Sequence, residues 1–160
     1  MHRFAVVLPL EPMALGERYA VRDWPLHLTV TPVFATGATT ATLAARMGEV
    51  ASAHGPLDAV AGPGELFGPR HDTPVALVDS AEVRALHAVL TDALAPLGIR
   101  FDSPHYAGEG FRPHITATTR GAAEDGQLLR LAQLALVDME PGPGQGRPQV
   151  VAVAALDGGR

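Results

Sequence analysis

The sequence predicts an α+β fold in which two antiparallel sheets line a central cleft and helices pack outside them. Three observations support this prediction. Strand-like runs occur in both halves of the chain, each half contains one long helical pattern, and each half has one strand carrying the tripeptide His-x-Thr. The two tripeptides begin at His27 and His114, 87 residues apart. We therefore expect a duplicated, two-lobed arrangement that forms a single domain over residues 1–160.

The first half of the chain is rich in short runs that favour strands. Val, Thr, Phe and Leu dominate these runs, and Gly or Pro residues mark their ends. The first His-x-Thr tripeptide lies in the second run. The expected strands are Arg3–Leu10, Leu26–Phe34, Leu57–Ala61, Glu65–Phe67 and Val75–Val78.

Two longer segments place their apolar residues on one face of a helix. Thr39–His54 has such a face and is ended by Gly55-Pro56. Ser80–Leu97 has a longer apolar stripe, with Ser80 as the expected cap of its first turn and Gly98 at its end. Each half of the chain thus contributes one long helix.

The remaining segments complete the second half. Phe111–Thr118 is the strand that carries the second His-x-Thr tripeptide, and a short helix is expected over Gly121–Leu131. The strands Gln133–Glu140 and Gln149–Leu156 form a terminal hairpin. The Pro- and Gly-rich loop 141–148 joins them. Whether this loop acts as a lid stays open.

Composition narrows the class of ligand. All twelve basic residues are Arg, and the formal net charge is −5. A protein that holds long nucleic acid normally presents a basic face to many phosphates. This chain supplies only a local basic patch, so we expect it to bind a nucleotide, a terminal phosphate or a short RNA end and no long duplex.

Composition also limits the location and chemistry of the protein. The chain has no Cys, which excludes disulfides, a thiolate nucleophile and a Cys-ligated zinc site. The opening apolar run is too short for a signal peptide, and no apolar stretch approaches the roughly 20 residues that span a bilayer. We therefore expect a cytoplasmic protein that does not associate with membranes, and we expect it to be a monomer.

The two His-x-Thr strands suggest a shared site. Alternate residues of a strand point to the same face, so His27 and Thr29 share one face and His114 and Thr116 share another. If the strands are neighbours, two imidazoles and two hydroxyls meet in one small volume, which suits proton transfer at a phosphate. A third match, His71-Asp72-Thr73, is flanked by Gly and Pro residues, so we interpret it as a loop and a chance match.

These residues resemble the 2H phosphoesterase superfamily, and especially its RNA 2′,3′-cyclic phosphodiesterase, or 2′-5′ RNA ligase-like, branch. His27-Leu28-Thr29-Val30 resembles the first motif of that superfamily. Gly110-Phe111-Arg112-Pro113-His114-Ile115-Thr116-Ala117 resembles the second, and its Phe-x-Pro-His run is the more specific part. A helix that ends in Gly before the second motif, as Ser80–Gly98 does, is a further similarity. The resemblance implies the two-lobed 2H phosphoesterase fold.

The resemblance also implies a function. A metal-independent phosphodiesterase of this type opens the 2′,3′-cyclic phosphates of RNA ends or nucleotides, and the resemblance also suggests reversible 2′-5′ RNA ligation as a side activity. One of His27 and His114 would take a proton from water, and the other would protonate the leaving ribose oxygen. The hydroxyls of Thr29 and Thr116 would bind the non-bridging oxygens. Which histidine is the acid and which is the base stays open.

Three further residues are expected to contact the substrate. Arg120, six positions after His114, and Arg112 are candidates for binding the phosphate. Tyr106 is the candidate for stacking on a base. The reaction scheme needs no cofactor and no metal ion.

Three other interpretations remain open from the sequence. His27 and His114 are ordinary strand residues in the first. In the second they ligate a metal ion, with Asp23 or Glu109 as a third ligand. In the third, the fold binds nucleotides or RNA ends without turnover.

Overall fold

The computed structural model describes residues 1–140 and 147–158 of the chain. Its α-helices are α1 (Thr40–Ser52) and α2 (Ala81–Leu94), and its 3-10 turns are η1 (Val21–Asp23), η2 (Ala95–Leu97), η3 (Pro104–Tyr106) and η4 (Gly108–Gly110). The strands are β1 (His2–Pro9), β2 (His27–Thr36), β3 (Leu57–Val60), β4 (Gly64–Phe67), β5 (Thr73–Leu77), β6 (Arg100–Phe101), β7 (His114–Thr116), β8 (Leu128–Leu131), β9 (Gln133–Asp138) and β10 (Gln149–Ala155).

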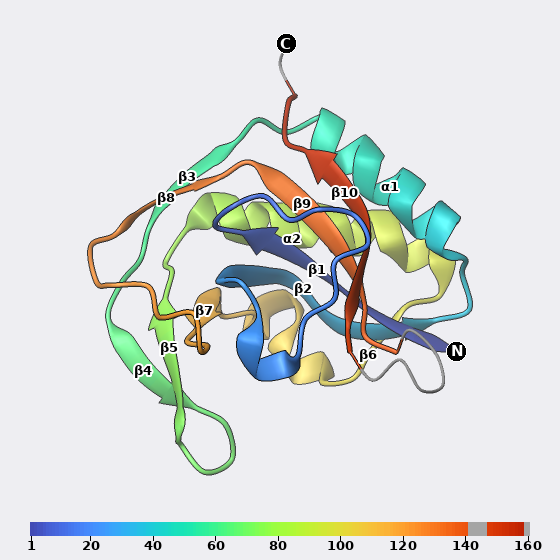
Figure 1. The fold of residues 1–160 in the computed structure, drawn as a ribbon. Helices are drawn as coiled ribbons and strands as arrows, with labels where there is room; N and C mark the ends of the chain where they lie inside the picture. Colours follow the sequence, from blue (N-terminus) through green and yellow to red (C-terminus); the bar gives the residue numbers. More distant parts are fainter. Residues whose placement is uncertain (141–146, 159–160) are drawn as a thin grey trace.

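Antiparallel pairing joins eight strands into one sheet. The strands follow the order β10-β9-β1-β2-β7-β5-β4, and β6 also pairs with β2. β3 and β8 form a separate two-stranded ribbon. The two lobes expected from the sequence are the two ends of this path, and they meet where β2 pairs with β7 (Figure 1). The α+β class and its two-lobed antiparallel arrangement are thereby confirmed.

The larger apolar core lies between the sheet and the two helices. Alternate residues along most of β1 and β2, such as Phe4, Leu8, Leu28 and Phe34, are buried in this core. In Figure 1, α2 passes behind β1 and β2, with α1 beside it next to β10. Burying one such side chain contributes roughly 1.5–3 kcal/mol, so this core dominates the stability of the sheet.

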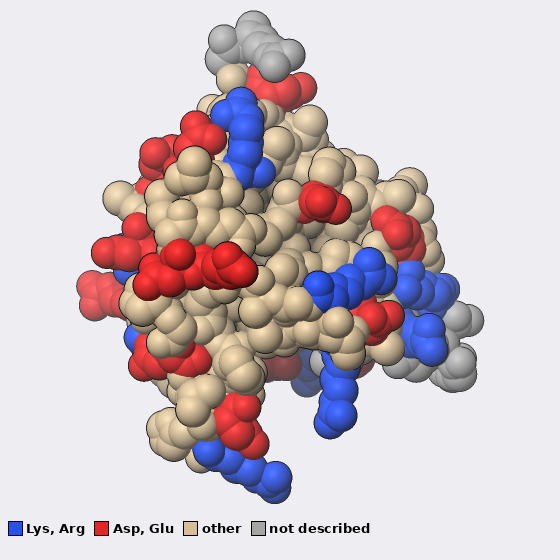
Figure 2. Space-filling view, turned by 60° about the vertical axis from the view of Figure 1, so that its left-hand side comes forward, with Lys and Arg blue, Asp and Glu red and all other residues tan. Residues whose placement is uncertain are grey.

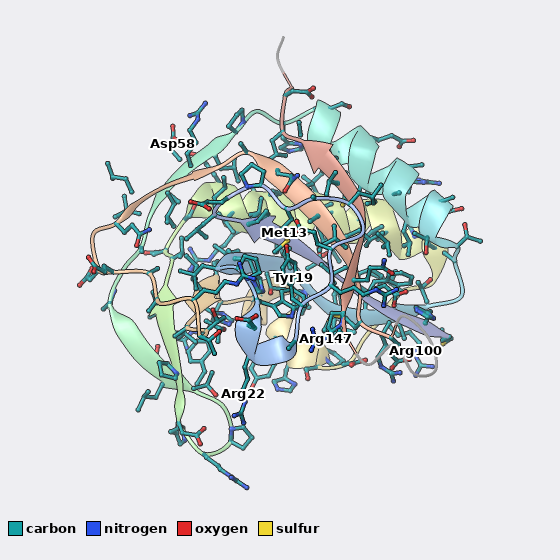
Figure 3. The ribbon with its side chains drawn as sticks, in the orientation of Figure 1. Met13, Tyr19, Arg22, Asp58, Arg100 and Arg147 are labelled. Carbon is teal, nitrogen blue, oxygen red and sulfur yellow. The ribbon has the colours of Figure 1, made fainter. Side chains whose placement is uncertain are left out.

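A second apolar cluster covers the opposite face of the sheet around β1, β9 and β10. The connection between β1 and β2 crosses this face and packs Met13, Tyr19 and Trp24 against Val7 and Val137. Figure 3 shows Met13 and Tyr19 in front of the sheet. The same connection ends in η1, directly before His27, so it borders the part of this face that carries the His-x-Thr residues.

Local signals explain the ends of the helices. The hydroxyl of Ser80 accepts a hydrogen bond from the backbone N–H of Val83, as expected for a cap, and Thr39 caps α1 in the same way through Thr42. Gly98 follows η2 with a φ of 71°, a left-handed conformation that glycine adopts without strain.

Two sequence predictions differ from the structure. The helix expected over Gly121–Leu131 is wrong, because this segment ends in strand β8, whose alternate residues Leu129 and Leu131 are buried against the core. The strand expected over Phe111–Thr118 is shorter, since Pro113 has no N–H for a ladder and pairing starts at His114. Residues 141–146 of the loop considered as a lid lie outside the described residues.

Within residues 1–140 and 147–158, none of the helices has both the length and the apolar character needed to cross a membrane.

Candidate active site

Strands β2 and β7 bring the two His-x-Thr tripeptides together. Leu28 pairs with Ile115, and both side chains are buried in the core between sheet and helices. Residues on either side of these two therefore project from the opposite face of the sheet. These residues are His27, Thr29, His114 and Thr116, and all four are half-buried.

The register of the pair makes the site pseudo-symmetric. Continuing the antiparallel register by one residue in each direction places His27 opposite Thr116 and Thr29 opposite His114. Each imidazole then lies beside the hydroxyl of the other tripeptide, and the two imidazoles lie on a diagonal. The positive charge of His114 lowers the pKa of His27, which also indicates that the two rings are near each other.

Backbone carbonyls fix the orientation of both imidazoles. Nδ1 of His27 bonds to the carbonyl oxygen of Pro25 at 2.9 Å, and Nδ1 of His114 bonds to that of Arg112 at 2.7 Å. A carbonyl can only accept, so the neutral tautomer with the proton on Nδ1 is the one these contacts favour. The lone pair then lies on Nε2, which has no hydrogen-bond partner among the described residues in either ring.

Burial sets the protonation of the two histidines. It is the main cause that lowers the pKa of His27, and the hydrogen bond to the Pro25 carbonyl opposes it. It also lowers the pKa of His114, where the Arg112 carbonyl opposes the effect and the Arg112 charge adds to it. At neutral pH both rings therefore favour the neutral form, in which Nε2 can accept a proton.

One aromatic ring packs against each of the two imidazoles. The ring centroid of Trp24 lies 4.7 Å from that of His27, and Phe67 of β4 lies 4.7 Å from His114. Neither contact is indicated by the sequence. Trp24 is the only Trp and comes three residues before His27, but nothing in that spacing predicts that it packs on the ring.

Arg120 lies on the His27 side of the site. The segment that follows β7 binds η1: the Thr118 hydroxyl donates to the Trp24 carbonyl at 2.8 Å, and Arg120 Nε donates to the Asp23 carbonyl at 2.9 Å. The Arg120 guanidinium lies 5.4 Å from the ring centroid of Tyr19. Its side chain is half exposed and extends from the segment that packs beside His27.

A pocket of about 360 Å³ adjoins Arg120. It lies where the β1–β2 connection faces β8, and Pro25 and Leu26 bring it next to His27. Apart from apolar side chains, it is lined by Glu11, Arg120, Gln127 and Arg130. The lining therefore combines apolar side chains with charged and amide groups in similar proportion, and it includes none of the four motif residues.

The other predicted contacts have different surroundings. Arg112 is exposed, pairs with Glu65 at 2.8 Å and lies 4.9 Å from the Phe67 ring centroid, which places it on the His114 side. Tyr106 is 58% exposed and its ring packs on His105; no hydrogen bond or ring contact among the described residues joins it to either candidate histidine. His71 lies in the exposed turn between β4 and β5, as expected for a loop residue.

The carboxylates considered as metal ligands do not complete a ligand set. Asp23 accepts a hydrogen bond from Thr119 at 2.6 Å and lies 3.8 Å from Arg120 Nε. Within the two described ranges, no three His, Asp or Glu side chains are grouped so that they could hold a metal ion.

Charge on the face of the molecule that Figure 2 shows is mixed. Figure 2 turns the left side of Figure 1 forward and shows separate groups of Asp and Glu side chains, mainly at the left of the view, with Arg side chains in other places. No continuous basic area covers this view. The face therefore lacks the extended positive surface that a long duplex requires.

Comparison with known proteins places the chain in a family. The model of the 2′-5′ RNA ligase superfamily matches residues 6–143. No curated protein sequence matches the chain. Similar solved structures include TT0787 of Thermus thermophilus, with 19% identity, a TM-score of 0.64 and coverage of 99% of this chain and 100% of that chain.

Escherichia coli LigT gives two further similar structures. The complex with 3′-AMP has 16% identity and a TM-score of 0.61, and the complex with NADP+ has 15% identity and a TM-score of 0.63. In both cases 97% of this chain and 98% of that chain are covered. At these identities the likeness concerns the fold.

Proposed function

Since the chain belongs to the 2′-5′ RNA ligase superfamily, we propose that it is a phosphodiesterase that opens the 2′,3′-cyclic phosphates of nucleotides or RNA ends. The single observation that carries this proposal is the pair of imidazoles on β2 and β7. Both have Nδ1 bound to a backbone carbonyl, and both leave Nε2 available on the same face of the sheet. Two such groups are what general acid and general base catalysis at one phosphate requires.

In the proposed reaction, a water oxygen attacks phosphorus in line with the ribose oxygen that leaves. Nε2 of one histidine takes a proton from the water as the new P–O bond forms. Nε2–H of the other gives its proton to the ribose oxygen as the old P–O bond breaks, so the product is a nucleoside monophosphate or its RNA equivalent. The pseudo-symmetry of the site suits either assignment of acid and base. When a 5′-hydroxyl replaces water as the nucleophile, its oxygen bonds to phosphorus while the P–O bond to the 3′-oxygen breaks and that oxygen is protonated, which gives a 2′-5′ linkage; the reverse of this step cleaves the linkage.

The threonines would stabilise charge on the phosphate. Thr29 and Thr116 each lie on the same face as the histidines, where a hydroxyl can donate to a non-bridging oxygen. A bound phosphate also supplies the negative charge that raises the pKa of a nearby histidine and so favours the protonated acid. This accounts for how a site with two neutral rings acquires its general acid.

Substrate contacts follow from the two sides of the site. We propose that Arg120 binds the phosphate, or the phosphate of an adjoining nucleotide, and that the pocket beside it takes the nucleoside part. Arg112 would bind from the His114 side. Tyr106 has the least support, because it is exposed and is joined to neither candidate histidine by the described contacts. The LigT complexes contain 3′-AMP and NADP+, so structurally similar proteins bind nucleotides, which supports a nucleotide as the ligand.

The test is incubation of the protein with adenosine 2′,3′-cyclic phosphate, followed by ³¹P nuclear magnetic resonance. The cyclic phosphate signal should be replaced by that of one adenosine monophosphate isomer. If no product forms, a titration with the same nucleotide followed by the protein's own ¹H resonances tests binding. Resonances that shift to saturation without any product would contradict catalysis and support the alternative, a module that binds nucleotides or RNA ends. The cytoplasmic location and the monomeric state also remain predictions.

A further inference from the structure

His87 is a buried histidine that lies outside the candidate active site. It is on α2, is 2% exposed, and is one of four buried polar or charged side chains in the described part of the chain. Its Nδ1 bonds to the carbonyl oxygen of Val30 at 2.7 Å, and its Nε2 accepts from the backbone N–H of Gly108 at 3.0 Å. Since the carbonyl must accept, the proton is on Nδ1, and both ring nitrogens are then satisfied by backbone groups.

The two backbone partners belong to the two segments that carry the candidate histidines. Val30 lies on β2, three residues after His27, and Gly108 begins the turn that leads into β7 and His114. Phe111, three residues before His114, stacks on the His87 ring with centroids 4.0 Å apart and an angle of 13° between the planes. A single side chain of α2 therefore contacts both segments.

His87 fills a gap in the pairing of β2. Along this edge, β7 pairs with β2 at Leu28, and β6 pairs with it only from Phe34 onwards. Between them, the Val30 carbonyl binds His87 and the Val33 carbonyl accepts from the backbone N–H of Asp102 at 3.0 Å. The imidazole thus substitutes for a strand where the sheet has none, and links β2 to the backbone just before β7.

We propose that His87 is a positioning residue that sets the place of β7 against β2, and with it the distance between His27 and His114. The inference rests on the proposed function, because its effect on turnover matters only if these two histidines do the chemistry. The β2–β7 ladder itself contains a single register pair, so contacts outside the ladder also set this spacing. Thr118 and Arg120 supply such contacts on the C-terminal side of β7, and His87 supplies them on its N-terminal side. Small displacements of reacting groups, about 1 Å, can cost on the order of a hundredfold in rate.

His87→Phe is the direct test. Phe keeps the aromatic volume and the stacking on Phe111 but removes both hydrogen bonds. We expect kcat for a 2′,3′-cyclic nucleotide to fall at least about tenfold while KM changes less than about twofold, because the misplaced pair still binds phosphate. A folded His87→Phe protein with the kcat of the wild type would overturn the proposal.

Thr36→Val is the matched control. Thr36 is also buried on β2, and its hydroxyl also makes two hydrogen bonds, donating to the Leu97 carbonyl and accepting from the Ala38 N–H. It lies at the end of β2 away from His27. The folded variant should keep the kcat of the wild type, and an equal fall in kcat in both variants would show a general structural effect and overturn the proposal.

A second measurement does not depend on activity. Histidine side-chain resonances of His27 and His114 should shift in His87→Phe and stay unchanged in Thr36→Val. If the wild type turns over no cyclic phosphate, the proposed function fails, but this comparison still decides whether His87 positions the pair. Should His87→Phe not fold, His87→Asn replaces it, because Asn keeps an N–H for the Val30 carbonyl. The resonances of His27 and His114 should then shift in the same way but by less.

Discussion

At each candidate histidine, the backbone carbonyl two residues earlier determines which ring nitrogen faces the site. Pro25 supplies that carbonyl for His27, and Arg112 supplies it for His114. The same short-range contact occurs twice, so the two imidazoles are presented in equivalent tautomers. A proton can then enter at one Nε2 and leave at the other without either ring turning.

The first prediction at this scale is the pH dependence of kcat/KM. Burial lowers the pKa of both His27 and His114 below about 6.5, so in the free protein the state with one neutral and one protonated ring is most populated below that pH. We expect kcat/KM for a cyclic nucleotide to be highest below pH 6.5 and to fall as the pH rises towards 8. A maximum at or above pH 7.5 would contradict the assignment.

The second prediction concerns the hydroxyls. Thr29→Val and Thr116→Val should each lower kcat by about 10²–10³-fold, the cost of removing one donor to a charged oxygen in a transition state. Thr31→Val is the control, since Thr31 lies on the same strand and its buried hydroxyl has no partner among the described residues. That variant should keep full activity and be as stable as the wild type or more stable. Equal losses in all three would exclude a specific role for the motif hydroxyls.

The four motif residues could be singled out from the sequence because strand periodicity alone decides which side chains share a face. That they act in catalysis stays a prediction. The contacts of Trp24 and Phe67 on the imidazoles, and the role of His87, could not be predicted in this way. They depend on which segments become neighbours in three dimensions, and no spacing along the chain encodes that.

At the scale of elements, the turns η3 and η4 determine how the chain enters β7. A Cβ at Gly110 would overlap the backbone carbonyl oxygen of His105, so only glycine allows the two turns to approach this closely. The segment also supplies the N–H of Gly108 to His87. Its compactness therefore affects the position of His114.

The third prediction follows from that close approach. Gly110→Ala should lower the free energy of unfolding by about 1–3 kcal/mol, measured by urea denaturation. Gly48→Ala is the control: Gly48 lies within α1 and its Cβ would meet no atom within 4 Å. Ala there should raise stability by roughly 0.5–1 kcal/mol. A Gly110→Ala protein as stable as the wild type would contradict the packing described here.

Long elements could be predicted from local pattern, whereas short ones could not. α1 and α2 begin at the residues after Thr39 and Ser80, as the caps indicate. The local pattern predicts a helix at β8 because Leu128, Leu129 and Leu131 also fit a helical face. Its partner β3 lies about seventy residues earlier in the chain, and this distant pairing overrides the local pattern.

At the scale of the whole molecule, the sheet has the larger apolar core on one face and the candidate site on the other. The helices bury one face, and the β1–β2 connection covers part of the other, which leaves the β2–β7 junction for the candidate site. The α+β class followed from the order of predicted elements. The joining of both lobes through one β2–β7 pair did not, because the pairing of strands is not encoded in their order. The single-domain organisation stays a prediction.

The fourth prediction is the pH dependence of stability. Burial lowers the pKa values of His27, His87 and His114 in the folded protein. Below about pH 6.5 the unfolded chain therefore binds more protons than the folded protein, so the free energy of unfolding falls as the pH drops from there towards the folded pKa values and is level above. Urea denaturation at pH 7.5, 6.5 and 5.5 measures this fall. His27→Asn should make the dependence of the free energy of unfolding on pH shallower. Stability that rises on acidification over this range would contradict the lowered pKa values of these histidines in the folded protein.

The central claim is that two histidines open a cyclic phosphate without a metal ion. Its most direct test is hydrolysis of the four nucleoside 2′,3′-cyclic monophosphates in the presence of EDTA by the wild type, His27→Ala and His114→Ala. We expect turnover by the wild type with EDTA present and a loss of at least about 10²-fold in each variant. Turnover that survives either substitution, or that occurs only when EDTA is left out, would contradict the claim.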